Sequence, residues 1–223
     1  MRHMRLLMIC ISSVLCFAAP SVFAKQSDLP EVTEDGLHRV PDSKLAIVYA
    51  EPEADLSVYK RVMLMDAYVA FRKNWARDQR RSSVNSLKVT SKDIEGIKSN
   101  LATEFHDVFK TTLENGGYEI VGEAADDVLL VRPAIINLDV NAPDTPRSSR
   151  TMTYTDSAGE MTLYIELYDS VTGDLIAKAL DRKVDNQAFY TWTNSVTNKK
   201  AAEKIMKGWA SILVTALNEA REP

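Results

Sequence analysis

The chain has 223 residues, of which 31 are acidic and 27 are Lys or Arg, so it carries a net charge of −4 at neutral pH. This mildly acidic balance argues against a general nucleic-acid-binding protein, which would show a basic excess clustered on one face. The two cysteines, Cys10 and Cys16, both lie near the N-terminus, so the rest of the chain holds no disulfide framework, thiolate nucleophile or cysteine-based metal site.

The first 24 residues have the three-part pattern of an export signal. Arg2 and Arg5 precede an uncharged apolar run over residues 6–19, and the −3 and −1 positions before the cleavage point suit a signal peptidase. The run is shorter than the ~20 residues that span a bilayer. We therefore expect a periplasmic protein cleaved after Ala24, with a net charge of −6, because the signal holds two arginines and no acidic residue. The alternative is an outer-membrane lipoprotein attached through Cys16, although a leucine precedes it where lipoprotein processing prefers a small residue.

Residues 25–55 are expected to form a leader, partly extended, ahead of a single domain over residues 56–220. The leader holds three prolines, mixed charge and one apolar run, LAIVYA, at residues 45–50. That run forms either a short strand or a segment along the domain surface. Composition does not choose between a free tail and a leader docked on the domain.

The first strand is predicted over residues 62–71. Its odd-numbered positions are the predicted core face, because they are uniformly apolar and share one side of a strand: Met63, Met65, Ala67, Val69 and Phe71. Residues 72–88 follow as a polar connection that carries six Lys or Arg residues and a single acidic residue.

A helix is predicted next, over residues 94–113. Thr90 and Ser91 precede Asp93, and a hydroxyl cap with an early acidic residue is typical of a helix start. Apolar residues then recur at helical spacing until Gly116 and Gly117 end the pattern. A short strand is expected over residues 118–121.

A long strand is predicted over residues 128–140 and a loop over residues 141–157. Pro133 cannot donate to a strand ladder, so it implies a bulge or an edge position. Arg132 falls in register with the apolar even-numbered residues. Either a bulge turns Arg132 outward or Arg132 is buried with a carboxylate partner, and the bulge is the simpler interpretation.

Residues 159–183 give the clearest pattern, a β-hairpin with its turn at Gly173. Its apolar face is Met161, Leu163, Ile165 and Leu167. An aromatic segment over residues 184–195 and an amphipathic helix over residues 199–220 complete the chain. The element order β-α-β-β-β-β-α predicts an α+β two-layer sandwich, in which an antiparallel-rich sheet carries two helices on one face.

No catalytic, metal or cofactor site can be assembled from the motifs. His38 and His106 are the histidines left after signal cleavage, and no second ligand accompanies either at metal-binding spacing. The sequence also lacks a nucleophile elbow and a glycine-rich turn before a helix. We therefore expect no cofactor and no enzymatic activity.

Two surfaces and one aromatic residue are candidates for partner binding. The basic connection, with Arg77, Arg80 and Arg81, is suited to an anionic partner. The second hairpin face, with Tyr164, Glu166 and Tyr168, has no predicted cover, and Trp192 is an aromatic of the kind found at interfaces or capping a core. The expected partner is an envelope protein, or an anionic envelope polymer or lipid, and not a nucleic acid.

Several phrases resemble the bacterial family called domain of unknown function 3313. They are DLSVYKRVML at residues 55–64, GGYEIV at residues 116–121, the hairpin, and the segment from Trp192 to a helix containing Trp209. The resemblance covers about residues 35–220 and implies an exported proteobacterial protein with no established activity and no catalytic residues to transfer. Many members are predicted lipoproteins, and this chain departs from them in lacking a convincing lipobox.

Three functions follow from these observations. The first is a non-enzymatic binding or scaffolding domain of the cell envelope. The second is a carrier of a small or lipidic ligand held between sheet and helices, and the third, a hydrolase, has the least support from the motifs.

Overall fold

The computed structural model describes residues 29–82, 89–140, 153–193 and 195–222, and the description below concerns the unit that begins at Glu31. The expected export signal, with Cys10 and Cys16, lies outside these residues. In chain order the elements are β1 (His38–Arg39), β2 (Ile47–Ala50), the short 3₁₀ helix η2 (Leu56–Val58), β3 (Arg61–Leu64), β4 (Tyr68–Phe71), α1 (Trp75–Ser82), α2 (Ser91–Asn115), β5 (Glu119–Ile120), β6 (Val128–Val140), β7 (Thr153–Asp169), β8 (Leu175–Thr193) and α3 (Ser195–Glu219). This content confirms the predicted α+β class.

The sheet has eight strands in the order β1-β2-β8-β7-β6-β3-β5, and β4 also pairs with β6. It is mixed, not purely antiparallel, because β3 and β4 run parallel to β6 and β5 runs parallel to β3. The predicted hairpin, β7 with β8, lies in its middle, between β6 and β2. β7 already begins at Thr153, inside the predicted loop, whose residues 141–152 lie outside the described part of the chain.

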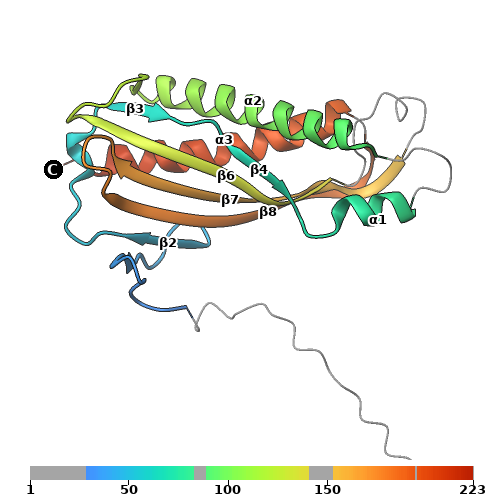
Figure 1. Ribbon diagram of the computed structural model, residues 1–223, viewed down its shortest axis with the longest axis horizontal. Helices are drawn as coiled ribbons and strands as arrows, with labels where there is room; N and C mark the ends of the chain where they lie inside the picture. The colour runs from blue at the N-terminus through green and yellow to red at the C-terminus, as the bar shows by residue number, and fades with distance from the viewer. Residues whose placement is uncertain (1–28, 83–88, 141–152, 194, 223) are drawn as a thin grey trace, which may run out of the picture. The chain divides into compact units, whose positions relative to one another are not determined.

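Helices α2 and α3 lie side by side and cover one face of the sheet, as predicted (Figure 1). Helix α2 begins where the sequence indicates. The Thr90 hydroxyl accepts a hydrogen bond from the Asp93 backbone N–H at 3.2 Å, and the Asp93 carboxylate accepts one from the Thr90 N–H at 2.8 Å. This reciprocal capping box satisfies two backbone donors that a helix start leaves unpaired. Gly117, with φ of +90°, follows the last turn, a backbone conformation that glycine adopts readily.

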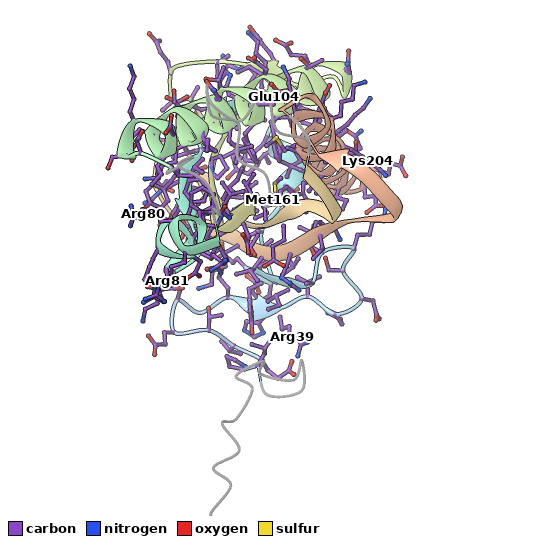
Figure 2. All side chains as sticks on the ribbon, turned by 90° about the vertical axis from the view of Figure 1, so that its right-hand side faces the viewer. Arg39, Arg80, Arg81, Glu104, Met161 and Lys204 are labelled. Atoms are coloured by element: carbon purple, nitrogen blue, oxygen red, sulfur yellow. The ribbon has the colours of Figure 1, made fainter. Side chains whose placement is uncertain are left out.

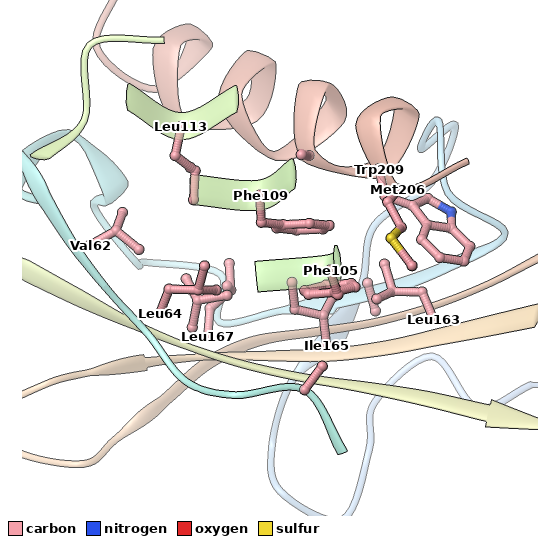
Figure 3. Close-up of a cluster of buried hydrophobic side chains, with 14 of the residues drawn as sticks. Val62, Leu64, Phe105, Phe109, Leu113, Leu163, Ile165, Leu167, Met206 and Trp209 are labelled. Atoms are coloured by element: carbon pink, nitrogen blue, oxygen red, sulfur yellow. The ribbon is translucent and has the colours of Figure 1, made fainter. Parts of the chain in front are cut away.

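The core lies between the two helices and the sheet (Figure 3). Phe105 and Phe109 of α2 are fully buried and stack with 3.9 Å between ring centroids. The predicted apolar face of the hairpin belongs to the same cluster, which confirms that the helices cover it. Each fully buried side chain of this size stabilises the fold by about 1.5–3 kcal/mol. The cluster also includes Val62, Leu64, Leu113, Leu163, Ile165, Leu167, Met206 and Trp209.

The predicted strand over residues 62–71 is two strands, β3 and β4, separated at residues 65–67. Val62 and Leu64 are buried in the core, so the predicted odd-numbered core face is wrong for β3. After the break Ala67 and Val69 are buried. Three residues outside regular strand geometry shift the alternation by one position, because side chains in a strand change face at every residue.

The expected polar connection over residues 72–88 contains a helix, α1. The exposed fraction of Trp75 is 1%, and its ring stacks on Phe71 with 4.0 Å between centroids. One buried aromatic residue thus fixes a short helix whose other residues are mostly polar.

Strand β6 has the predicted bounds, but the bulge is not at Pro133. The register with β7 is continuous through Pro133 and shifts between Ile136 and Asp139, where Asn137 has φ of +52°. Pro133 lies where the pairing of β6 changes from β3 to β4. Arg132 points outward without a bulge, because the odd-numbered residues of β6, not the even-numbered ones, face the core up to Ile135.

Candidate functional site

The candidate site lies on the face of the sheet opposite α2 and α3, which we call the outer face. Tyr164, Glu166 and Tyr168 alternate along β7 with the buried Leu163, Ile165 and Leu167, so their side chains share the outer face. The structure brings these three predicted residues into direct contact.

Glu166 is the centre of this cluster. Its Oε1 accepts a hydrogen bond from the Tyr164 hydroxyl at 2.6 Å, and its Oε2 accepts one from the Tyr168 hydroxyl at 2.9 Å. The exposed fraction of the Glu166 side chain is 16%. Burial, followed by the hydrogen bond to Glu166, raises the pKa of both tyrosine hydroxyls above the ordinary value.

Two cations flank Glu166 across the sheet. Arg132 on β6 and Lys178 on β8 are its directly opposite neighbours in the strand register. The Arg132 Nη1 lies 3.6 Å from the Glu166 Oε2, and 66% of the Arg132 side chain is exposed. Lys178 pairs with Asp35. Glu166 is therefore the negative centre of a row of charges that crosses three strands.

The N-terminal segment covers one side of the outer face. Residues 32–38 form a turn in which the Thr33 N–H donates to the Leu37 carbonyl at 2.9 Å, and Leu37 is buried. Asp35 of this turn forms an ion pair with Lys178 and places a negative charge near Tyr164. The expectation that this hairpin face has no cover is thus wrong at β8, where a segment distant in sequence lies over it.

Strand β2 is the apolar run at residues 45–50 for which the sequence left two alternatives. Its residues 47–50 pair antiparallel with β8, which makes it a strand of the sheet. Just before it, the Ala46 N–H donates to Asp181 Oδ1 at 3.1 Å. The buried Asp181 also accepts from Trp209 Nε1 at 2.7 Å, so one carboxylate joins this segment, β8 and α3.

The outer face is open at the other side, around the break between β3 and β4. Met65 is 46% exposed and Tyr68 is 66% exposed. Tyr68 lies opposite Ala134 on β6, two residues beyond Arg132 and beside Tyr164 on β7. We call Met65, Tyr68 and Arg132 the open patch. The sequence singled out none of these three for binding, and no local signal does so, because the patch arises from register and from the break.

The remaining predicted site residues lie elsewhere. Arg77, Arg80 and Arg81 are exposed on α1. Trp192 is in β8, with its backbone opposite Tyr154, and its side chain lies outside the described part of the structure. Arg77, Arg80 and Arg81 therefore lie on a different element from Tyr164, Glu166 and Tyr168, and the side chain of Trp192 is not assigned to either surface.

Within the described residues, no group of three or more His, Cys, Asp or Glu side chains is placed to hold a metal ion. The same residues contain no helix that is both long and apolar enough to cross a membrane. His38 and His106 stand on different elements, β1 and α2. Around Glu166 the outer face offers two tyrosine hydroxyls, a carboxylate and the exposed Arg132 guanidinium, all of which can donate or accept hydrogen bonds.

Solved structures with a similar chain path have little sequence in common with this protein. A PelC dodecamer from Paraburkholderia phytofirmans is 13% identical with a TM-score of 0.40, and the match covers 74% of this chain and 95% of that one. A DUF330 protein from Xanthomonas campestris is 11% identical with a TM-score of 0.43, covering 78% and 94%. A DUF4136 protein from Bacteroides thetaiotaomicron is 11% identical with a TM-score of 0.34, covering 78% and 95%. Scores of this size carry no argument about function.

Among curated proteins, none is similar enough to count as a match. A family model does match, over residues 25–213, and its description is "Protein of unknown function (DUF3313)". The matched region includes both the N-terminal turn and the whole sheet. The resemblance noted in the sequence is thereby confirmed, and the chain belongs to the DUF3313 family.

Proposed function

We propose that this protein is an exported, non-enzymatic periplasmic protein that binds another envelope protein through the outer face of its sheet. The export pattern of residues 1–24 supports the location. The open patch supports the binding, and it is the single observation on which the proposal rests.

The open patch has the composition of an interface centre. Tyr, Met and Arg are enriched at protein interfaces, and Tyr and Arg are enriched among the residues that dominate binding energy. Here one residue of each type is exposed around a single break in the sheet. The partner that fits such a surface is another protein with an apolar contact for Tyr68 and a carboxylate or carbonyl for Arg132.

The neighbouring cluster supports binding by holding the surface in place. Glu166 is bonded to two tyrosine hydroxyls and lies beside Arg132, so these side chains lose little freedom when a partner arrives. Preorganised groups bind more tightly because less conformational entropy is lost.

The same cluster is poorly suited to acid–base catalysis. A catalytic base or nucleophile works best with a pKa near the operating pH. Burial and Glu166 raise the pKa of Tyr164 and Tyr168 above a value that is already high, so both hydroxyls stay protonated at neutral pH. The rise in the pKa of the two hydroxyls favours a binding role for these tyrosines.

The proposal is tested by recovering partners of the tagged protein from the envelope fraction of its own cells. The test variant is Y68A/R132E, which truncates one exposed side chain of the open patch and reverses the other. The control is V171A/K110E, which makes the same two kinds of change on the β7–β8 turn and on α2, where Val171 is 56% and the Lys110 side chain 47% exposed.

We expect quantitative mass spectrometry to find an envelope protein that is recovered with the wild type and with the control but not with Y68A/R132E. Binding between the two purified proteins should show the same difference. The proposal is wrong if no envelope protein is enriched, or if Y68A/R132E retains every partner of the wild type.

A further inference from the structure

Helix α1 is held rigidly at the end of β6. Trp75 Nε1 and Gln79 Nε2 each donate to the Val140 carbonyl at 3.2 Å. The preceding Arg72 bonds Asp139 of β6 at 2.5 Å and Asp78 of α1 at 2.8 Å. These contacts fix the rotation of the helix about its axis, and so they fix the direction of its remaining side chains.

The three arginines of α1 lie on the side of the helix away from Trp75. Because successive residues of an α-helix are turned by about 100°, Arg77, Arg80 and Arg81 fall at roughly 200°, 140° and 240° from Trp75. They share one arc, centred opposite the buried ring, and all three are exposed. Figure 2 shows Arg80 and Arg81 directed outward from α1.

This arc is a local excess of positive charge on an acidic protein. Asp78 is the one acidic residue of α1, and it is already bonded to Arg72 at 2.8 Å and lies 3.6 Å from Arg77. Within the described residues, Arg80 and Arg81 have no carboxylate within ion-pair distance. Elsewhere on the chain acidic residues outnumber basic ones.

We propose that this arginine surface of α1 docks the protein on an anionic lipid bilayer. Among the described residues, the three side chains project from one exposed arc of the helix and no other element faces them, so they fit a plane of many laterally mobile phosphates better than one bound phosphate. Guanidinium groups suit this role because they bind phosphate oxygens through paired hydrogen bonds. This surface differs from the open patch, and the inference stands or falls independently of a protein partner.

The inference is tested by sedimenting the exported protein, purified after signal removal, with vesicles of equal parts phosphatidylglycerol and phosphatidylcholine at low ionic strength. The test variant is R77Q/R80Q/R81Q. The matched control is K44Q/K60Q/K207Q, which removes the same charge from exposed lysines on three other parts of the chain. Circular dichroism and the midpoint of thermal unfolding establish that both variants fold.

Each basic residue near an anionic bilayer strengthens binding about five-fold, so the arginine variant should bind about 100-fold more weakly than wild type. The lysine control should stay within about three-fold of wild type, and binding should fall as salt is added. The inference is overturned if the wild type does not bind these vesicles, if it binds pure phosphatidylcholine equally well, or if the two variants lose binding equally.

Discussion

Replacing Glu166 with alanine tests how strongly the outer-face cluster stabilises the fold. The substitution removes the acceptor of two hydrogen bonds, from Tyr164 at 2.6 Å and from Tyr168 at 2.9 Å. It also removes the ion pair with Arg132, which contributes little because the arginine side chain is 66% exposed.

The magnitude follows from the two hydrogen bonds. A hydrogen bond to a charged group contributes about 1.5–3 kcal/mol, and water can reach these half-buried hydroxyls after the mutation, so the lower figure applies to each. We therefore expect E166A to lower the free energy of unfolding by about 3 kcal/mol. Y168F, which removes one of the two bonds, should lower it by about half as much.

The assay is urea unfolding followed by tryptophan fluorescence, because Trp75 and Trp209 are buried in the fold. The control is E160A, on the same strand, because the Glu160 side chain is 28% exposed against 16% for Glu166 and its ion pair with the half-exposed Arg182 should be worth less than about 1 kcal/mol. If the free energy of unfolding of E166A lies within about 0.5 kcal/mol of the wild-type value, or falls by no more than that of E160A, the cluster does not stabilise the sheet as we describe.

The remaining predictions concern a buried carboxylate, Asp181, and a half-buried one, Asp127. W209F removes the indole donor to Asp181, a 2.7 Å bond between two buried groups. It should lower the free energy of unfolding by about 1.5–3 kcal/mol, measured with urea, and an unchanged midpoint would exclude that role. The hydrogen bond from Arg61 lowers the pKa of Asp127 in the folded protein below its value in the unfolded chain. The pair therefore stabilises the fold at pH values above the unfolded pKa, and this stabilisation is lost as the pH falls through the folded pKa. The urea midpoint should therefore drop as pH falls below about 4, the ordinary pKa of an aspartate, and by less in D127N; an equal drop in D127N would refute the assignment.

Local signals predicted the elements that depend on neighbouring residues. The α2 start was readable because Thr90 and Asp93 are three residues apart and each side chain bonds to the other's backbone N–H. The hairpin was readable because every second residue of β7 from Met161 to Leu167 is apolar. Both patterns need no information from distant parts of the chain.

The break between β3 and β4 was not readable in this way. The odd-numbered apolar residues begin at Met63 and Met65 and continue at Ala67 and Val69, so the apolar pattern of the sequence gives no sign of the break. Its phase changes in the structure because Val62 and Leu64 face the core instead. Strand β6, which pairs with both β3 and β4, selects that phase.

Part of the candidate site could be predicted from the sequence, and the rest depends on which strands pair in the fold. Tyr164, Glu166 and Tyr168 share one strand face by alternation alone. Arg132 joins them only through the register of β6 against β7, which no local pattern specifies. The cover from Asp35 depends on a contact 143 residues along the chain.

Photo-crosslinking in intact cells shows whether the outer face binds an envelope protein. A photoreactive amino acid replaces Tyr68 in the open patch or, as the control, Lys110 on α2, and adducts are identified after illumination. We expect one specific envelope-protein adduct from position 68, absent from position 110 and suppressed by R132E. No adduct at position 68, or the same adduct from both positions, would contradict it.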